Sequence, residues 1–489
     1  MIKLLNALLT YGIENKIIID FHKAKSNLAL LFNITNFDYE PLSMPIDQTL
    51  KQLLDMGYKQ SLFRPNTLLE RDAFEAHIFD QIMPSPSETK KQFKQLYKKD
   101  YRLAVNYLYQ LSKDTMYIKT TRINQNIKWV YTSSFGDFEM TINLSKPEKD
   151  PKDIAKVIHK EHVETSGEPL CILCKENEQR YENAKKNLRI VPITLNHETW
   201  HFQFSPYAYF KQHAIILSDQ HTEMKISVDT FNCLFDFVDI MPDYLIGSNA
   251  DIPIVGGSIL NHNHYQVGRY TFPIESASVI KDYAVDSMMI SHLNWPLSTL
   301  RCVSKDRGQL IVFANHILSI WKRYTNEELD IIAHTTTNHQ TITPILRKEN
   351  EAYILYLILR NNRTSKSYPD GIFHPHPNVQ HIKKENIGLI EAMGLAILPG
   401  RLKKELMHCF EYLSNNEDHI TINKHKPWLE HLKQTKHVNS ISDLYQEVGL
   451  VFENVLIDSG VFKLDQQGIA ALDSLMNNCI KTYKKVVQN

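Results

Sequence analysis

The segment from Gly256 to Gln266 constrains this chain more than any other; it contains the sequence Gly-Gly-Ser-Ile-Leu-Asn-His-Asn-His-Tyr-Gln. His262, His264 and Gln266 stand at alternate positions, and alternate side chains of a β-strand point to the same face. The sequence therefore predicts a strand that presents these three side chains on one surface. Because glycine lets a backbone approach an anion closely, the neighbouring Gly-Gly-Ser turn indicates phosphoryl chemistry. On this segment alone, a metal-binding or buried polar His-x-His pair is the alternative.

Composition excludes several classes of protein. The 489 residues are enough for two or three domains, and 43% of them are hydrophobic. Lys+Arg and Asp+Glu both number 55, so no global basic field indicates nucleic acid, and an anionic ligand needs local groups. No apolar run approaches the ~20 residues of a membrane helix, and the apolar start is expected to be an amphipathic helix rather than a signal peptide. Six cysteines make no disulfide scaffold, so the cytoplasm is the expected compartment.

Hydrophobic periodicity predicts four successive regions. They are a helical N-terminal region (1–115), two halves of a strand-rich core (116–275 and 276–400) and a helical C-terminal region (401–489). Strands are expected at 129–131, 140–144, 199–205, 213–218, 310–313 and 353–359, and helices at 227–240, 329–336 and 383–398. Ser87 is expected to cap a helix that follows the Pro84–Ser87 connector.

Two cysteines form the pair Cys171-x-x-Cys174. A lone pair at this spacing is compatible with half of a zinc site or with a redox pair. No second pair follows at zinc-finger spacing, so a metal site here needs remote ligands.

Several motifs in order resemble the galactose-1-phosphate uridylyltransferase (UDP-glucose–hexose-1-phosphate uridylyltransferase) family of the histidine-triad superfamily. These motifs are the cysteine pair, the segment Leu217-Ser218-Asp219-Gln220-His221 and the segment from Gly257 to Gln266. Asn263 and Tyr265 stand where the better-known branch of the family has a proline and a glycine. In these two departures the chain resembles the divergent second branch of the family. The resemblance implies an α+β fold: a histidine-triad-like, mainly antiparallel sheet core in two similar halves, with helical regions at both ends.

The resemblance also implies roles for individual residues. His264 corresponds to the nucleophile and Gln266 to the glutamine that holds the transferred phosphoryl oxygens. The implied substrate-binding residues are Asn249, Gly256, Gly257, Ser258, Lys146, Lys383 and Lys384, of which Lys146 replaces an arginine. The implied ligands of a structural zinc ion are Cys171, Cys174, His221 and His262. For Lys383 and Lys384, a solvated surface pair is the alternative.

A second His-x-His motif occurs at His374-Pro375-His376. No glutamine follows it at the right distance and no Gly-Ser loop precedes it, so the nucleophile is expected at His264 instead. By position it resembles a motif that binds a second metal in the better-known branch, together with His339. Ordinary polar loop histidines are the alternative.

The implied reaction transfers UMP from UDP-glucose to galactose-1-phosphate through a uridylyl-histidine, as in galactose catabolism by the Leloir pathway. A neutral imidazole is a good nucleophile near pH 7. The resemblance also implies a homodimer and no organic cofactor. Two alternatives stay open: a histidine-triad nucleotide phosphorylase or hydrolase, and a non-catalytic zinc-stabilised nucleotide-binding protein.

Overall fold

The computed structural model describes residues 1–145, 168–257 and 259–487. Two compact units make up the chain. The first unit contains the described residues of Met1–Thr121, Lys160–Ala208 and Gln212–His221. The second contains those of Arg122–His159, Tyr209–Lys211 and Thr222–Asn489. In the described part of the chain, no helix is long and apolar enough to cross a membrane.

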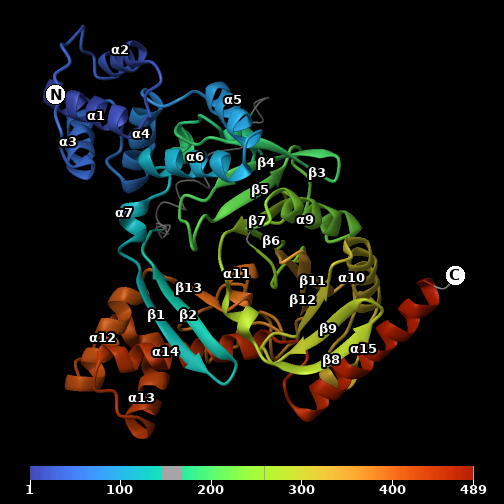
Figure 1. Cartoon of the computed structure of the whole chain (residues 1–489). Helices are drawn as coiled ribbons and strands as arrows, with labels where there is room; N and C mark the ends of the chain where they lie inside the picture. The colour runs from blue at the N-terminus through green and yellow to red at the C-terminus, as the bar shows by residue number, and fades with distance from the viewer. Residues whose placement is uncertain (146–167, 258, 488–489) are drawn as a thin grey trace. The chain divides into compact units, whose positions relative to one another are not determined.

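The beginning of the first unit is helical, as predicted (Figure 1). Its helices are α1 (Ile2–Glu14), α2 (Phe21–Leu31), α3 (Ile46–Lys59), α4 (Leu68–Asp80), α5 (Pro86–Tyr97), α6 (Tyr101–Asp114) and the short α7 (Thr120–Ile123). The apolar side of α1 is buried, with Leu5, Leu8 and Leu9 fully inaccessible, in a core shared with α2, α3 and α4. The amphipathic pattern of the chain's start therefore forms a packed helix.

The cap of α5 differs from the prediction. Ser85, not Ser87, is the N-cap residue, and its side chain accepts a hydrogen bond from the Glu88 backbone N–H. The Glu88 carboxylate accepts one in return from the Ser85 backbone N–H, at 2.8 Å. This reciprocal pair satisfies two N–H groups of the first turn, and Pro86 stands at a position where no N–H is needed.

The first unit also contains an antiparallel set of strands. These are β3 (Val191–Leu195), β4 (Glu198–Phe204) and β5 (Ala214–Ser218), with β4 between the other two. Trp200, Phe202 and Phe204 on β4 are buried, as their alternation predicted. Gln203, on the opposite face, is buried as well.

Most strands of the second unit pair antiparallel, in the order β7-β6-β11-β12-β10-β9-β8. Their bounds are β6 (Leu245–Gly247), β7 (His264–Gly268), β8 (Val279–Val285), β9 (Met288–Leu293), β10 (Thr299–Ser304), β11 (Gln340–Glu349) and β12 (Ala352–Asn361). A smaller sheet contains β1 (Ile127–Ser133), β2 (Gly136–Asn143) and β13 (Leu395–Pro399), in which β13 runs parallel to β2. The predicted α+β class with a mainly antiparallel sheet is confirmed.

Helices cover the sheet of the second unit and form its C-terminal part (Figure 1). They are α9 (Val228–Ile240), α10 (Arg307–Trp321), α11 (Leu389–Ala392), α12 (Leu402–Asn415), α13 (Lys426–Thr435), α14 (Ile441–Ser459) and α15 (Gln466–Val487). α9 contacts β6 and β11, and α10 contacts β10, β11 and β12. Phe138 lies between Trp295 and Phe452, with ring centroids 5.1 and 6.0 Å away, in a core that also contains α12 and α14.

Short 3₁₀ turns complete the described elements. They are η1 (Lys175–Asn177), η2 (Glu182–Ala184), η3 (Pro273–Ser276), η4 (Glu327–Leu329) and η5 (Ile420–His425).

Three local predictions were wrong. The apolar run 310–313 belongs to helix α10, because four apolar residues fit a buried helix as well as a strand. The predicted helix 329–336 is replaced by η4 and irregular chain. The predicted helix 383–398 divides into α11 and β13, separated by Gly394, whose φ of +96° is incompatible with a continuous helix.

Candidate functional site

β7 positions the predicted nucleophile. The strand begins at His264 and pairs with β6 so that Gln266 lies opposite Gly247. His264 and Gln266 therefore share one face, as the alternation predicted. His262 lies before the strand, so the prediction of three side chains on one strand was wrong. Because His262 lies outside the strand, the alternation of side chains in β7 does not determine where its ring points. The ring of His262 can therefore face a different site from that of His264.

The His264 ring is held in one tautomer. Its side chain is buried, with 6% of its surface exposed, and Nδ1 lies 2.8 Å from the backbone oxygen of His262. A carbonyl oxygen can only accept, so Nδ1 carries the proton and Nε2 carries the lone pair. Among the described residues, Nε2 has no hydrogen-bond partner. Burial lowers the pKa of His264 below its ordinary value of 6.5, which favours the neutral ring.

The glycine loop before β7 folds tightly against the chain that follows β6. A Cβ on Gly256 would lie 2.3 Å from the backbone oxygen of Ala250, so only glycine fits there. A Cβ on Gly257 would lie 2.6 Å from Nδ2 of Asn249, at the end of a side chain. The Asn249 Oδ1 accepts a 2.8 Å hydrogen bond from the backbone N–H of Leu389. The structure thus brings Asn249, Gly256 and Gly257 together.

Two predicted binding residues, Ser258 and Lys146, lie outside the described residues.

The two adjacent lysines have different environments. Lys383 is buried, and its Nζ lies 3.0 Å from Glu391 Oε1 and 3.6 Å from Glu385 Oε2. These carboxylates raise the pKa of Lys383 despite its burial. The alternative of a solvated pair is therefore wrong for Lys383, which is committed to an internal ion pair. Lys384 is exposed, as the alternative of a solvated residue predicted for it.

Sequence analysis missed Arg360, near the end of β12. Its side chain is 1% exposed, and Nη2 donates a 2.9 Å hydrogen bond to the Ile387 backbone oxygen. Nε and Nη1 have no partner among the described residues, and burial lowers the pKa of Arg360 to about 10. In the register of β11 and β12, Arg360 lies opposite Thr341. The Thr341 hydroxyl donates a hydrogen bond to Asp251, in the loop that follows β6. The sequence feature that could have drawn attention to Arg360 is a charged residue directly after the apolar run of β12.

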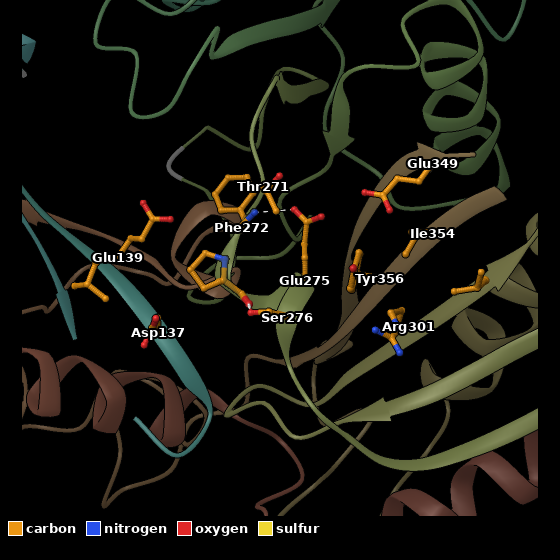
Figure 2. Close-up of a pocket in the computed structure, with 13 residues that line it drawn as sticks. Asp137, Glu139, Thr271, Phe272, Glu275, Ser276, Arg301, Glu349, Ile354 and Tyr356 are labelled. Atoms are coloured by element: carbon orange, nitrogen blue, oxygen red, sulfur yellow. Dashed lines mark hydrogen bonds between the residues drawn. The ribbon is translucent and has the colours of Figure 1, made fainter. Parts of the chain in front are cut away.

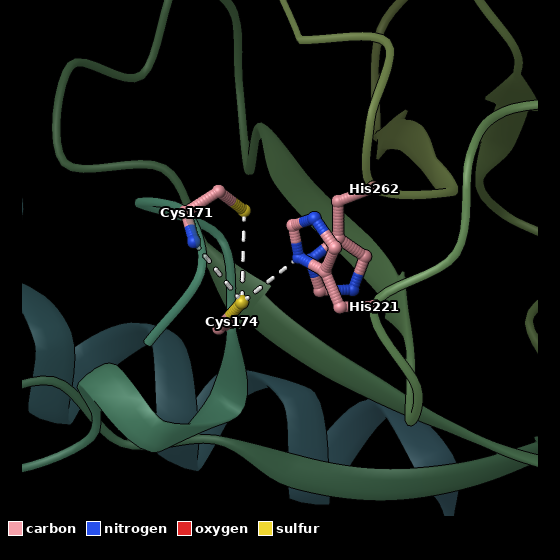
Figure 3. Close-up of side chains that lie close together, drawn as sticks. All are labelled: Cys171, Cys174, His221 and His262. Carbon is pink, nitrogen blue, oxygen red and sulfur yellow. Dashed lines mark hydrogen bonds between the residues drawn. The ribbon is translucent and has the colours of Figure 1, made fainter. Parts of the chain in front are cut away.

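A second group of side chains contains the four predicted metal ligands (Figure 3). Cys171, Cys174, His221 and His262 each offer one ligand atom, and these atoms lie within 4.8 Å of one another. The Sγ atoms of the two cysteines are 3.7 Å apart, and Cys174 Sγ is 3.2 Å from His221 Nδ1. The structure gathers all four predicted residues.

The donor set fits a tetrahedral zinc ion. Zn–S bonds of about 2.3 Å imply about 3.8 Å between two sulfur ligands, whereas a disulfide requires about 2.05 Å. The observed 3.7 Å between the sulfurs matches the metal geometry. Burial raises the pKa of Cys174 to about 11, so without a nearby cation this thiol stays neutral. A metal ion would supply the charge that a thiolate needs.

Sequence analysis also missed a residue that supports the cysteine pair. Asn177 is buried, and its Nδ2 donates to the backbone oxygens of Cys171 and Cys174, at 2.8 and 2.9 Å. The backbone N–H of Leu173 points at Cys171 Sγ, at 3.3 Å. These bonds hold the turn in a shape that directs both sulfurs to one point.

The residues of the predicted second metal site are not gathered. In the part of the chain that the structure describes, no cluster joins His339, His374 and His376 around one point. Both ring nitrogens of His339 are already engaged, by Thr335 Oγ1 at 2.7 Å and by Asn362 Oδ1 at 2.9 Å. His374 is buried, and burial lowers its pKa. The second metal remains a prediction without geometric support.

A cavity of about 610 Å³ lies elsewhere in the second unit (Figure 2). Asp137, Glu139, Glu275, Arg301 and Tyr356 are among its lining residues. None of the predicted site residues lines it. Two of its carboxylates have internal partners, since Glu139 accepts from Tyr270 and Glu275 pairs with Arg347. This cavity is therefore distinct from the His264 site.

The α+β fold, with a buried neutral histidine beside a tight glycine loop, fits the class of nucleotidyltransferases. Two family models match the chain: the galactose-1-phosphate uridyl transferase N-terminal domain over residues 32–223 and its C-terminal domain over residues 236–429. The chain belongs to the galactose-1-phosphate uridyl transferase family, and the resemblance of its motifs is confirmed.

Named relatives match nearly the whole chain. The galactose-1-phosphate uridylyltransferase of Clostridium acetobutylicum is 46% identical over 97% of this chain and 99% of its own length. That of Halalkalibacterium halodurans is 41% identical over 97% of each. Among solved structures, yeast Ap4A phosphorylase Apa2 covers 72% of this chain and 94% of its own, with 10% identity and a TM-score of 0.35. That last likeness is too distant to indicate a function.

Proposed function

We propose that this protein transfers UMP from UDP-glucose to galactose-1-phosphate, giving UDP-galactose and glucose-1-phosphate, with His264 as the nucleophile. The observation that carries the proposal is the hydrogen bond from His264 Nδ1 to the His262 oxygen, which leaves the lone pair on Nε2. The names of the relatives support uridylyl transfer to galactose-1-phosphate. The reaction belongs to galactose catabolism, and the cytoplasm and a homodimer remain predictions.

In the first step, the Nε2 lone pair attacks the α-phosphorus of UDP-glucose. A P–N bond forms, the bond from that phosphorus to the bridging oxygen breaks, and glucose-1-phosphate leaves with the electron pair. In the second step, a phosphate oxygen of galactose-1-phosphate attacks the same phosphorus and the P–N bond breaks. Nucleophilic catalysis divides one displacement into two, so ping-pong kinetics are expected.

The tautomer supports both steps. Because Nδ1 keeps its proton, the uridylylated ring carries positive charge, and the carbonyl oxygen of His262 faces that N–H at 2.8 Å. An acceptor at this position stabilises the charged ring and retains the tautomer for the second step. No proton has to enter or leave the ring during transfer.

We assign the phosphoryl oxygens to neutral donors. Gln266 shares the face of His264 on β7, and Gly256, Gly257 and Asn249 form the loop beside it. N–H groups fixed by the fold stabilise charge on these oxygens without reorganising during the reaction. Ser258 and Lys146 are assigned to the same binding surface, and exposed Lys384 to a substrate phosphate. Lys383 holds Glu391 instead.

We also propose a structural zinc ion bound by Cys171, Cys174, His221 and His262, which would fix the backbone of these four residues. His262 would then have two roles, because its ring binds the ion and its carbonyl oxygen orients His264. Elemental analysis tests this assignment: Cys174→Ser is expected to lose a zinc ion that the wild type retains. Equal zinc in both proteins would contradict it.

The test of the reaction is the intact mass of the protein after mixing with UDP-glucose. We expect the wild type to gain one uridylyl group and to lose it on addition of galactose-1-phosphate, whereas His264→Ala gains nothing. An adduct in His264→Ala would show that another residue is the nucleophile. Turnover of UDP-glucose without a sugar phosphate would favour a hydrolase. Nucleotide binding without any adduct would favour the binding-protein alternative.

A further inference from the structure

A second cluster of metal-ligand side chains lies far along the chain from the first, in the C-terminal helical part. His408 and Glu411 stand three residues apart on α12, and side chains at this spacing lie on the same face of a helix. His419 comes from the segment between α12 and η5. All three side chains are partly exposed, although the Nε2 atom of His419 is itself buried. No residue of this cluster belongs to the proposed active site.

The three side chains converge. Each offers one ligand atom, and these atoms lie within 4.8 Å of one another. His419 Nε2 is 2.9 Å from Glu411 Oε2, and the rings of His408 and His419 stack with centroids 4.0 Å apart and 15° between their planes. Glu417 adds a carboxylate oxygen 3.9 Å from His419 Nε2. His419 Nε2 thus has two carboxylates within 3.9 Å, and the His408 ring stacks beside it.

A neighbouring hydroxyl orients one of the imidazoles. His408 Nδ1 lies 2.6 Å from Thr421 Oγ1. The Thr421 hydroxyl can accept a hydrogen bond from Nδ1–H, and in that tautomer the lone pair of His408 is on Nε2, ready to bind a metal. Histidine ligands of protein metal sites commonly donate their other ring N–H to such a partner, which fixes both tautomer and ring direction.

We propose that His408, Glu411 and His419 bind a divalent transition-metal ion of the zinc type. Two imidazoles and one carboxylate are a frequent zinc ligand set, with a fourth position left to water or to Glu417. One metal ion would contact the Glu411 carboxylate and both imidazoles at once, because their ligand atoms lie within 4.8 Å of one another. The ion would join α12 to the segment that leads into η5, and would stabilise this region in proportion to its occupancy.

The test counts zinc ions bound per chain after equilibration in one zinc buffer. The proteins are the wild type, the combined variant His408→Ala with His419→Ala, and the control His431→Ala, which removes an exposed histidine of α13. We expect the wild type and His431→Ala to bind one more zinc ion per chain than the combined variant. Equal counts in all three would overturn the proposal and leave a His419–Glu411 ion pair. Because the readout is a difference, it does not depend on whether the cysteine cluster is occupied.

Two further measurements keep the test decisive if the combined variant fails to fold. Thr421→Val removes only the orienting hydroxyl, and we expect about 10- to 100-fold weaker zinc binding at this site. Unchanged affinity in Thr421→Val would overturn the proposal. With Co²⁺ in place of zinc, the increment bound by this site must lack thiolate-to-metal charge-transfer absorption, because its ligands are nitrogen and oxygen only. An increment with thiolate absorption would assign the ion to the cysteines.

Discussion

Two His-x-His motifs in this chain have the same spacing but different surroundings. At His262-Asn263-His264, the second imidazole is on a strand and donates from Nδ1 to a backbone oxygen, and its Nε2 has no hydrogen-bond partner among the residues that the structure describes. At His374-Pro375-His376, the second imidazole lies in irregular chain. Its Nε2 is 3.0 Å from the Ile372 oxygen, and its Nδ1 is 3.3 Å from Asp458 Oδ1.

The difference shows what makes a histidine a nucleophile. His376 has an oxygen acceptor beside each ring nitrogen and stacks on Tyr368, with 4.2 Å between ring centroids, so protein groups occupy the surroundings of both nitrogens. His264 has one acceptor, and this single bond decides which nitrogen is left to react. Hydrogen-bond partners, rather than the motif, therefore distinguish the two histidines.

The largest expected effect concerns the two imidazoles themselves. His264→Ala removes the atom that forms the P–N bond, and we expect kcat for uridylyl transfer to fall by about 10⁴- to 10⁶-fold. The matched variant His376→Ala should stay within about tenfold of the wild type, since both nitrogens of its imidazole already contact protein oxygens. Steady-state transfer rates, with circular dichroism to verify folding, measure both. A larger loss in His376→Ala than in His264→Ala would reverse the comparison.

The glutamine that follows only the first motif gives the next effect. Gln266→Ala removes a neutral donor beside the transferred phosphoryl group, and we expect kcat to fall by about 10²- to 10³-fold. Gln266→Glu has the same shape but places negative charge there, so its loss should be at least as large. Single-turnover rates of adduct formation separate this effect from product release. Full activity in Gln266→Glu would exclude the proposed role.

The glycine loop, which the second motif lacks, provides a matched pair of variants. Gly256→Ala places a methyl group 2.3 Å from a backbone oxygen, and we expect unfolding free energy to fall by about 1–3 kcal/mol. Gly257→Ala meets the end of the Asn249 side chain, which can move, so its stability loss should be smaller. Urea denaturation of both variants measures the difference. Equal losses would show that Ala250 also moves aside.

His376→Ala is expected to affect stability although it spares the chemistry. It removes a contact with Asp458 and the stacking on Tyr368, both partly exposed, so we expect a loss of about 1 kcal/mol in unfolding free energy. Thermal denaturation measures it, and Asp458→Asn is the control for the charged part. An unchanged melting temperature in both would mean that this imidazole contributes no net stability.

The smallest effect is in the pH dependence. Burial disfavours the imidazolium form, so the pKa of His264 lies below 6.5 and more than half of the rings are neutral at pH 6.5. We therefore expect the rate of adduct formation to fall less than twofold between pH 7.5 and 6.5, and to decline at lower pH. Stopped single-turnover reactions across this range provide the measurement. A midpoint above 6.5 would indicate that a carboxylate or another partner stabilises the charged ring.

Particular residues show how far the sequence could go. Alternation placed His264 and Gln266 on one face, and family resemblance selected Cys171, Cys174, His221 and His262, which the structure gathers. The sequence could not show that Lys383 is buried against Glu391, because an ion pair depends on chain segments that meet only after folding.

The same limit applies to secondary structure. The run 310–313 is apolar in either a strand or a helix, and its place in α10 follows from the cap at Asp306 and from packing on the sheet. Arg360 looked like the polar end of a strand, yet it is among the most buried side chains of the second unit. Local patterns report periodicity, whereas burial depends on what covers a residue.

By itself, the sequence determined the periodic elements and the shared face of His264 and Gln266, because these depend on residue types and on short-range order. The resemblance of its motifs to a family supplied the expected fold class, the candidate nucleophile and the candidate metal ligands. Only the tertiary structure decided which nitrogen of His264 is free, and it also separated the two His-x-His motifs and gathered His408, Glu411 and His419. The physical reason is that a hydrogen bond or a ligand cluster requires atoms within about 3–5 Å. That proximity arises from packing between segments, which no local pattern encodes.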